Sequence, residues 1–504
     1  MNNHKFIILC IFSFLLFISS CTSHFGETKI KDQRSAAQWY QQGRAKVLQR
    51  QHNLLQNIRK QNKTGQSKAK NIIFVLGDGM GISTLTAARI FVGQQQGLLG
   101  EEFALSFEAF PHSALIKTYN VDLQTPDSAG TMSALMTGVK TNEGIISLPD
   151  SVKRGDCSSM VDKILPTLMD IAKEKGKSTA MITTARVTHA TPATTYAHSV
   201  ERNWESDETM SSSAKGLGCR DIATQFIAAQ GASLDILFGG GRRHFLSIEE
   251  GGKRTDNRNL IKEWQQQGEY VGSLNELNQL GVAADKGKPW LGLFSSSHMG
   301  YAYQRPAEQP SLQQMVAVAL QRLQQDEQGY SLVIEAGRID HGHHGGTAYK
   351  ALSETQELHE TVAWLLTQVD LNETLIVVTA DHSHTLTLGG DATRGNPILG
   401  PMIGNDAKGY PNRSVSVDRN GHAYTSLTYR DGPGAMIARD DLVDHYQQPD
   451  YQQPEYQQVA LVPMDYETHA GEDVALYAIG PQARLFSGTL EQHWVFHALK
   501  YAMQ

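Results

Sequence analysis

The sequence predicts a three-layer α/β/α protein, with a central, mainly parallel sheet and a β-rich insertion (a crown) near the C-terminus. From residue 71 onward, strand-length apolar runs alternate with helix-length segments. The strand runs are almost continuously apolar, as in parallel sheets that helices cover on both faces. Several runs end in Asp, Glu or His, which indicates a site at the carboxyl edge of the sheet.

The first residues predict export. Lys5 precedes an apolar stretch, residues 6–18, which is too short to span a membrane as a mature helix and is typical of a signal peptide. Ile-Ser-Ser-Cys at residues 18–21 resembles a bacterial lipobox. We therefore expect residues 1–21 to be a signal peptide with lipobox and Cys21 to carry a lipid. The protein would be periplasmic or an outer-membrane-anchored lipoprotein of a Gram-negative-type bacterium. An ordinary cleaved signal peptide is the alternative.

Residues 22–70 are polar and rich in Gln, and they predict a polar leader followed by an N-terminal helical arm. A flexible spacer is the alternative interpretation. The apolar positions of this segment recur at loosely helical spacing. They are Trp39, Val47, Leu48, Leu54, Leu55 and Ile58.

Residues 71–384 and 466–504 carry the alternating pattern of the predicted core. The expected strands are residues 72–76, 178–182, 234–238, 332–334, 375–378 and 474–479. The expected helices are residues 166–175, 311–325 and 348–368. The intervening segment 385–465 is rich in Gly, Asn, Asp and Tyr and predicts the β-rich crown. Its Tyr-Gln-Gln-Pro repeat, from Tyr446 onward, predicts a surface loop because proline disfavours helix and central strand.

Charge and cysteine content narrow the possible functions. The formal net charge of -7 gives no basic footprint for nucleic acid, so small solutes are the expected partners. Of four cysteines, Cys10 and Cys21 belong to the leader. Cys157 and Cys219 are either a disulfide, plausible in an oxidising compartment, or two separate buried thiols. A bridge would stabilise the fold by roughly 4 kcal/mol on the chain-entropy model.

Three segments offer metal ligands directly before or after apolar runs. The densest reads Glu-Ala-Gly-Arg-Ile-Asp-His-Gly-His-His and covers residues 335–344. The second is Asp-His-Ser-His at residues 381–384, and the third places His469 before the run 474–479. Crowded carboxylates and imidazoles repel one another or are poorly solvated unless cations hold them, so the sequence predicts a metal-dependent enzyme. A flexible histidine loop without a ligand is the alternative for the first segment.

Two further segments place an aspartate and a serine near the same edge. Gly-Asp-Gly-Met-Gly follows the first strand and predicts a tight turn holding Asp78. Asp127 and Ser128 stand where a helix begins, and helix capping is their ordinary explanation. The same position would aim Ser128 at an anion held by the helix N-terminus, and a serine there can act as a nucleophile beside a metal.

Together these motifs resemble those of alkaline phosphatases, closest to the animal-type branch. The resemblance runs from about Trp39 to the C-terminus. Its motifs are Gly-Asp-Gly-Met-Gly with Asp78, Asp127-Ser-Ala, Val-Glu-Arg-Asn-Trp with Arg202, residues 335–344, Asp381-His382 and Glu-Thr-His-Ala-Gly-Glu-Asp at residues 467–473.

The resemblance implies two Zn²⁺ and one Mg²⁺ per subunit, each with suitable donors. The implied ligands are Asp340, His344 and His469 for one zinc, Asp78, Asp381 and His382 for the other, and Asp78, Thr191 and Glu335 for magnesium. An additional Ca²⁺ site is not expected, because the corresponding stretch, residues 293–295 with Gln309, lacks two carboxylates. His343 and His384 receive no ligand role and are expected behind the ligands or facing solvent.

The resemblance also implies a mechanism and an assembly. Ser128 would attack phosphorus and become a phosphoserine, Arg202 would bind the phosphate in a bidentate manner, and water would release inorganic phosphate. His189 and His341 match the animal-type pattern near the phosphate. Cys157 and Cys219 match a disulfide pair of that branch, and a homodimer is expected.

The leading hypothesis is therefore a membrane-tethered hydrolase of small phosphomonoesters. A phosphodiesterase or sulfatase of the same superfamily is the enzymatic alternative. Ser128 differs from the sulfatase Cys-x-Pro-x-Arg signature, and Arg202 favours a dianionic monoester. A non-catalytic zinc-binding lipoprotein is the third possibility, which the retained serine and arginine disfavour.

Overall fold

The computed structural model describes residues 38, 40–42, 44, 45, 47, 48, 68–228, 233–283, 287–435 and 450–503. The predicted signal peptide with Cys21 lies outside these residues, as do Trp39, Leu54, Leu55 and Ile58 of the predicted arm. The described residues between 38 and 48 are helical. Within the described part of the chain, no helix combines the length and apolar character needed to cross a membrane.

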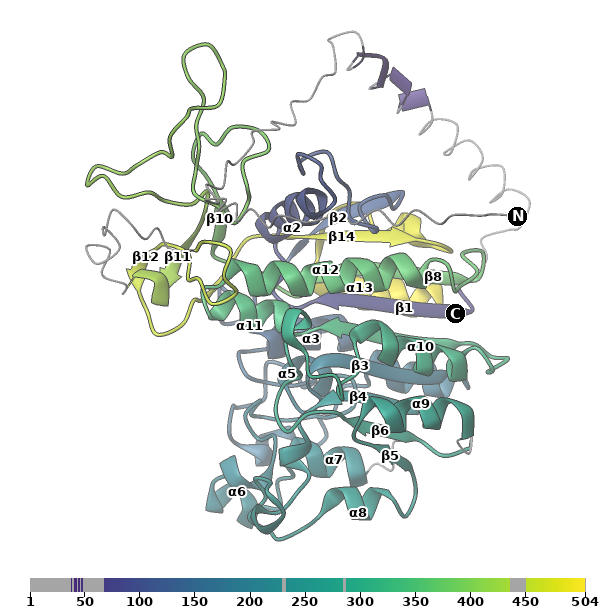
Figure 1. The fold of residues 1–504 in the computed structure, drawn as a ribbon. Helices are drawn as coiled ribbons and strands as arrows, with labels where there is room; N and C mark the ends of the chain where they lie inside the picture. Colours follow the sequence, from purple (N-terminus) through teal and green to yellow (C-terminus); the bar gives the residue numbers. More distant parts are fainter. Residues whose placement is uncertain are drawn as a thin grey trace, which may run out of the picture.

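A ten-stranded, mainly parallel sheet forms the centre of the molecule (Figure 1). The first strand, β1 (Asn71–Gly77), lies between β7 (Tyr330–Ala336) and β8 (Thr374–Ala380) and is parallel to both. The antiparallel member is β14 (Val474–Ile479), between β8 and β2. The order is β15-β2-β14-β8-β1-β7-β3-β4-β6-β5. The other strands are β2 (His112–Lys117), β3 (Ser178–Arg186), β4 (Ile236–Gly240), β5 (Glu269–Val271), β6 (Trp290–Leu293) and β15 (Gly488–Glu491).

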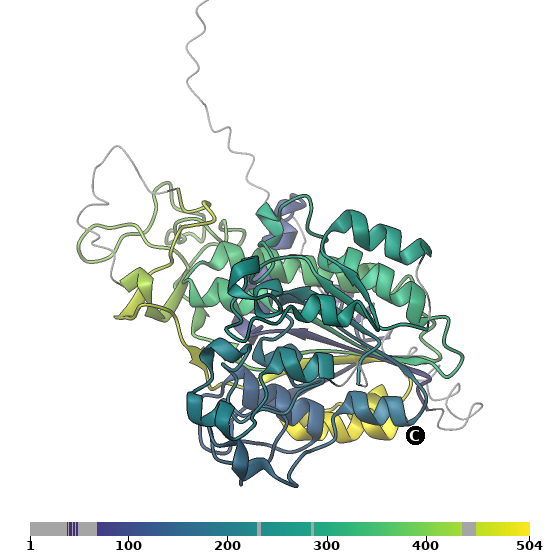
Figure 2. The same ribbon diagram turned by 90° about the horizontal axis from the view of Figure 1, so that it is seen from below.

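The central strands are buried on both faces, as their apolar runs predict. Every residue of β7 and β8 is buried, and in β1 all but the first are. Helices α2 (Ile82–Gln95), α10 (Leu312–Leu323) and α12 (Ala348–Leu365) pack together on one face, and α3 (Ser128–Thr137), α4 (Leu168–Glu174) and α13 (Gln492–Ala502) on the other (Figure 2). The three-layer prediction is confirmed.

Short helices complete the connections. The α-helices are α5 (Ala190–Ala193), α6 (Ser212–Gly216), α7 (Ile222–Ala228), α8 (Leu260–Trp264), α9 (Leu274–Ala283) and α11 (Arg338–His344). The described 3₁₀ helices are η1 (Cys157–Met160), η2 (Asp207–Thr209), η3 (Arg242–His244), η4 (Ile248–Glu250), η5 (Ala302–Gln304), η6 (Pro433–Ala435) and η8 (Ala483–Leu485). The three long helices expected from the sequence are observed, each slightly shorter than predicted.

The segment that follows the metal-ligand motif at 381–384 forms additional small sheets. β10 (Leu386–Leu388), β11 (Leu427–Gly432) and β12 (Ala460–Pro463) form a three-stranded sheet to one side of the main sheet (Figure 1). Residues 389–426 between its first two strands contain turns and isolated bridges. Residues 446–449 of the tyrosine repeat are outside the described residues. Tyr451 lies in a turn as predicted, but its side chain is buried.

Residues 335–344 do not form the flexible loop that was the alternative for this segment. Glu335 belongs to β7, and α11 begins at Arg338, three residues later. A Cβ on Gly342 would lie 2.5 Å from the backbone nitrogen of Ala351, so this glycine permits α11 to pack closely on α12. Helix geometry then places Asp340 and His344, four residues apart, on the same face.

A second, smaller hydrophobic cluster lies apart from the main core. Its buried members are Ile145, Leu148, Val152, Val200, Trp204, Met210 and Ala214, with Met160 and both described cysteines packed against it. We call it the satellite cluster. A disulfide joins Cys157 to Cys219 at its edge, which decides between the two alternatives left by the sequence.

Candidate metal centre and active site

Strand register brings three carboxylates to one edge of the sheet. Leu76 of β1 pairs with Glu335 of β7, and Gly77 pairs with Ala380 of β8. Asp78 and Asp381 each follow the last residue of their strand, so they lie beside each other. The carboxyl ends of parallel strands are where open α/β sheets place their sites. The site therefore begins at the centre of the sheet.

Two of these carboxylates, Asp78 and Glu335, have oxygens that lack the partners a buried charge requires. Asp78 and Glu335 are fully buried, and Asp78 Oδ1 and both carboxylate oxygens of Glu335 have no hydrogen-bond partner among the described residues. Burial raises the pKa of Glu335 to about 8, and burial together with Asp381 raises the pKa of Asp78. Thr191 Oγ1 lies 3.4 Å from Asp78 Oδ2. Asp78, Thr191 and Glu335 thus form an all-oxygen set suited to a hard cation.

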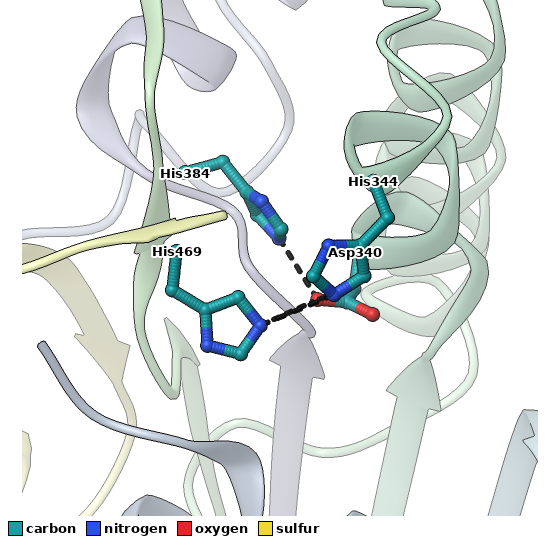
Figure 3. Close-up of side chains that lie close together, drawn as sticks. All are labelled: Asp340, His344, His384 and His469. Carbon is teal, nitrogen blue, oxygen red and sulfur yellow. Dashed lines mark hydrogen bonds and ion pairs between the residues drawn. The ribbon is translucent and has the colours of Figure 1, made fainter. Parts of the chain in front are cut away.

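Three possible ligand atoms lie close together at this edge (Figure 3). They are Asp340 Oδ1, His344 Nε2 and His469 Nε2. His344 Nδ1 lies 2.6 Å from the carbonyl oxygen of Glu467, and His469 Nδ1 lies 2.8 Å from that of Pro126. Each Nδ1 must donate, so each Nε2 carries a lone pair in the neutral ring. The two Nε2 atoms are 3.2 Å apart and lie 3.2 and 3.3 Å from Asp340 Oδ1. Three acceptors facing one another fit a cation.

His384 lies next to these three residues but does not act as a metal ligand. Its Nε2 lies 2.8 Å from Asp340 Oδ1, and its Nδ1 lies 2.6 Å from Glu467 Oε2. Burial opposes a charge on this ring, but the two carboxylates outweigh burial and raise its pKa to about 10. A doubly protonated imidazole has no lone pair for a metal. His384 therefore orients Asp340 and leaves three ligands in the cluster.

A second group, Asp78, Asp381 and His382, lies on the other side of His469. His382 Nε2 is 3.4 Å from both Asp78 Oδ1 and Asp381 Oδ2. Burial lowers the pKa of His382, so the ring is neutral and its stacking against His469, at 3.7 Å between centroids, brings no repulsion between charges. Two carboxylates and one imidazole form a second mixed set of oxygen and nitrogen donors. This set also fits a cation.

Ser128 is the first residue of α3 and lies beside the second group. Its Oγ is 3.0 Å from His382 Nε2, and its side chain is buried. Asp127 is the N-cap: its Oδ1 accepts from the backbone N–H of Gly130 at 3.0 Å. Capping by Asp127 leaves the Ser128 hydroxyl available for the site.

Arg202 approaches from the satellite cluster. Its Nη1 donates to Asp127 Oδ2 at 2.9 Å, and its Nη2 donates to His189 Nε2 at 3.4 Å. Although burial opposes ionisation of Asp127, Arg202 and the Gly130 N–H hold its pKa below the usual value. Asp127 thus links the helix that carries Ser128 to the guanidinium.

His189 stands beside Arg202, and His341 stands beside His189; both rings are neutral. Burial, with Arg202 adding to it, lowers the pKa of His189, and burial lowers that of His341 to about 3. The His341 Nδ1–H donates to the Gly337 carbonyl oxygen at 2.7 Å, so its Nε2 is an acceptor. The two rings are 5.6 Å apart between centroids. This wall of the site carries no positive charge from histidine.

All the predicted site residues except Cys21, Cys157 and Cys219 lie at this edge of the sheet. The disulfide lies at the satellite cluster, and Cys21 is outside the described residues. His343 and His384 do not face solvent: both are buried, and His343 Nε2 and Nδ1 lie 3.0 Å from Thr84 Oγ1 and 2.8 Å from the Tyr429 hydroxyl.

The roles of His384 and Glu467 were not predicted from the sequence. The signal for His384 was present in its spacing of two from His382, because alternate residues of an extended segment point to the same side. The pairing of Glu467 with His384 depends on β9 (Ser383–His384) and β13 (His469–Ala470), which meet across the crown segment.

Unpartnered buried carboxylates and converging imidazole lone pairs at the edge of a parallel sheet define a metal-dependent α/β enzyme. The family model for alkaline phosphatase matches residues 69–504. This chain belongs to the alkaline phosphatase family, whose members are metal-dependent and hydrolyse phosphomonoesters.

Individual relatives support the same assignment. The tissue-nonspecific alkaline phosphatase of Gallus gallus is 41% identical over 457 residues, covering 87% of this chain and 85% of the relative. That of Rattus norvegicus is 39% identical, covering 97% and 92%. Among solved structures, alkaline phosphatase from the Antarctic bacterium TAB5 has a TM-score of 0.60, covers 87% of this chain and 98% of that chain, and is 20% identical. The last comparison bears on the fold alone.

Proposed function

We propose that this enzyme hydrolyses phosphomonoesters through a phosphoserine on Ser128. The observation that carries the proposal is the position of the Ser128 hydroxyl: it starts α3 and lies 3.0 Å from His382 Nε2 within the second donor group. An anion at this point would meet the N-terminus of α3, where backbone N–H groups and the helix dipole favour negative charge. Family membership supports the reaction class.

The donor sets support two Zn²⁺ and one Mg²⁺. Asp340, His344 and His469 would hold one zinc, and Asp78, Asp381 and His382 the other. The oxygen set of Asp78, Thr191 and Glu335 would hold magnesium. When bound, these cations would lower the pKa of hydroxyl groups and neutralise charge on the leaving and attacking oxygens.

The protein's own groups would divide the remaining work. Ser128 Oγ would form a bond to phosphorus as the alcohol departs, and water would later break that bond and release inorganic phosphate. Arg202, held by Asp127, would pair with two phosphate oxygens through its planar fork. Neutral His189 and His341 would flank the phosphate without adding charge.

A trapping experiment tests the nucleophile. The metal-loaded protein is mixed with p-nitrophenyl phosphate and quenched in acid, and the tryptic peptide with Ser128 is analysed by mass spectrometry. We expect a mass increase of one phosphoryl group on Ser128 in the parent protein and none in Ser128→Ala. Serine nucleophiles that act as a unit with their neighbours carry roughly 10³-fold or more of the rate. Full turnover by Ser128→Ala, with zinc and magnesium content retained, would exclude the covalent path.

The substrate class is tested by a paired assay with bis-p-nitrophenyl phosphate. Arg202 can pair with two non-bridging oxygens of a dianionic monoester, whereas a diester offers only a single negative charge. We expect the monoester to be hydrolysed much faster. Preferential cleavage of the diester would assign the enzyme to the phosphodiesterases.

We also propose that the protein is exported, lipidated at Cys21 and dimeric. The leader with its lipobox supports the first two points, and the disulfide is consistent with an oxidising compartment. Mass spectrometry of the intact protein from membranes would detect the lipid, and its absence in Cys21→Ser is the control. Light scattering of the soluble form would give the mass of the assembly.

A further inference from the structure

A third histidine, His298, lies against the phosphate wall of the site. Its ring centroid is 3.9 Å from that of His341 and 5.5 Å from that of His189. The three imidazoles therefore form one packed group, which we call the histidine wall. His298 comes from the segment after β6, far in sequence from both partners.

The backbone of this segment is fixed without help from the His298 ring. The Ser295 hydroxyl donates to the His298 carbonyl oxygen at 2.7 Å, and the N–H of Met299 donates to the Thr184 carbonyl at 3.0 Å. The Gly241 N–H donates to the Ser297 carbonyl at 2.8 Å. Replacing the His298 side chain should therefore leave the path of the chain unchanged.

The His298 ring contacts Arg186, and the Arg186 guanidinium is in turn paired with Glu205. A neutral imidazole has one acceptor nitrogen, so His298 accepts from Arg186 either at Nδ1, which lies 3.3 Å from the backbone nitrogen, or at Nε2, which faces Nη1. The guanidinium of Arg186 is paired with Glu205, with Nε–Oε2 at 2.7 Å and Nη2–Oε1 at 2.6 Å. Thr188 Oγ1 also donates to Glu205, at 2.7 Å. His298 is thus attached to a rigid, charge-paired support.

The other two rings of the histidine wall have few anchors of their own. Within the described part of the chain, His341 has one hydrogen bond, from Nδ1 to the Gly337 carbonyl oxygen. His189 Nδ1 is buried without a partner among the described residues, and its Nε2 has only the 3.4 Å contact from Arg202. One hydrogen bond leaves a ring free to tilt, so packing against His298 supplies the missing restraint.

We propose that His298 is a positioning residue that fixes the His341 and His189 rings and, through His189, the Arg202 guanidinium at the phosphate. The inference rests on the proposed function, which places a phosphate at this wall. His298 acts by ring packing from behind and touches neither substrate nor cation. Its effect should appear in phosphate affinity, because sub-ångström displacement of a positioning group is costly in a preorganised site.

Three substitutions separate ring packing from hydrogen bonding. His298→Ala removes both, His298→Phe keeps a flat ring but loses both nitrogens, and His298→Asn keeps a short acceptor for Arg186 but loses the ring. The matched control is Ser296→Ala, because Ser296 is an exposed neighbour in the same segment. All variants are measured as full-length, metal-loaded protein.

The readouts are kcat and KM for p-nitrophenyl phosphate, the Kd of inorganic phosphate by calorimetry, zinc and magnesium content, and Tm. We expect His298→Ala to raise KM and the phosphate Kd about tenfold, with kcat within threefold and metal content unchanged. His298→Phe should stay within threefold of the parent protein, and His298→Asn should resemble His298→Ala. Ser296→Ala should change nothing.

Two results would overturn the proposal. One is a phosphate Kd and KM for His298→Ala within twofold of the Ser296→Ala control. The other is a His298→Phe variant as impaired as His298→Asn, which would exclude ring packing. Should His298→Ala fail to fold, the Phe and Asn variants still decide the question. A parent protein that neither turns over the monoester nor binds phosphate would instead overturn the proposed function.

Discussion

The metal-binding edge and the satellite cluster support the same site in different ways. Glu335 stands on β7, and Asp78 and Asp381 directly follow β1 and β8; these three adjacent strands in the middle of the sheet are buried except at Asn71. Arg202 stands on a connection between α5 and α6, where its N–H donates to the Gly144 carbonyl at 2.8 Å and its neighbours pack in the satellite cluster. Cation binding and phosphate binding should therefore be separable by mutation.

The largest effect is expected at the metal-binding edge. Asp340→Asn should lower kcat by roughly 10³-fold or more and reduce bound zinc, because Asp340 Oδ1 is where the His344 and His469 Nε2 atoms converge. Metal analysis and steady-state kinetics measure the two losses. Asp418→Asn, an exposed aspartate far along the crown segment, is the control. Normal zinc content with normal rate in Asp340→Asn would remove this ligand assignment.

A smaller but different effect is expected at Arg202. Arg202→Ala should raise KM and the phosphate Kd by about 10²-fold with metal content unchanged, since two charge-assisted hydrogen bonds to phosphate are lost. Arg202→Lys should recover only part of the affinity, because an ammonium cannot bind two oxygens as a planar fork. Loss of zinc in Arg202→Ala would show that the two regions are not independent.

A third prediction tests whether the satellite cluster holds the arginine. The double variant Cys157→Ser with Cys219→Ser should unfold more easily, by up to about 4 kcal/mol, and should raise KM a few-fold while retaining its metals. Denaturant unfolding and kinetics at a temperature well below the Tm separate the two effects. An unchanged KM would mean that the disulfide and the satellite cluster do not position Arg202.

The smallest effect concerns the pH dependence of the metal-free protein. The pKa of Glu335 is raised to about 8 in the fold, so the folded state binds a proton that the unfolded state has lost. That contribution to stability is complete below the unfolded pKa, roughly 4.3, and disappears as pH rises through about 8. The Tm of chelated protein should fall across this range, and Glu335→Gln should flatten the curve. A chelated parent protein whose Tm rises with pH would contradict the burial of an unpaired carboxyl.

The two regions also differ in how much of their structure the sequence predicts. Residues at the ends of β1 and β8 could be placed because apolar runs mark parallel strands, and strand ends meet at one edge. The helix α11 was not foreseen, because its one glycine and three histidines are poor helix formers and its packing on α12 depends on Gly342. The packing of α11 on α12 therefore outweighs the low helix propensity of its residues.

Other parts of the site had no local signal. The charge on His384 depends on Glu467, which pairing of distant strands brings to it. His298 lies in an unpatterned segment, and its contact with His341 arises from the arrangement of β3, β6 and α11. Contacts of this kind form only in the folded chain, and the spacing of residues along the sequence does not predict them.

The pairing of β9 with β13 has a consequence for biosynthesis. β1 is the first strand to be made, yet His469, which completes the first donor group, lies in the last part of the chain. A ribosome must therefore translate the chain through residue 469 before that group can exist. Such long-range closure slows folding, and a nascent chain would offer incoming cations only fragments of the final set.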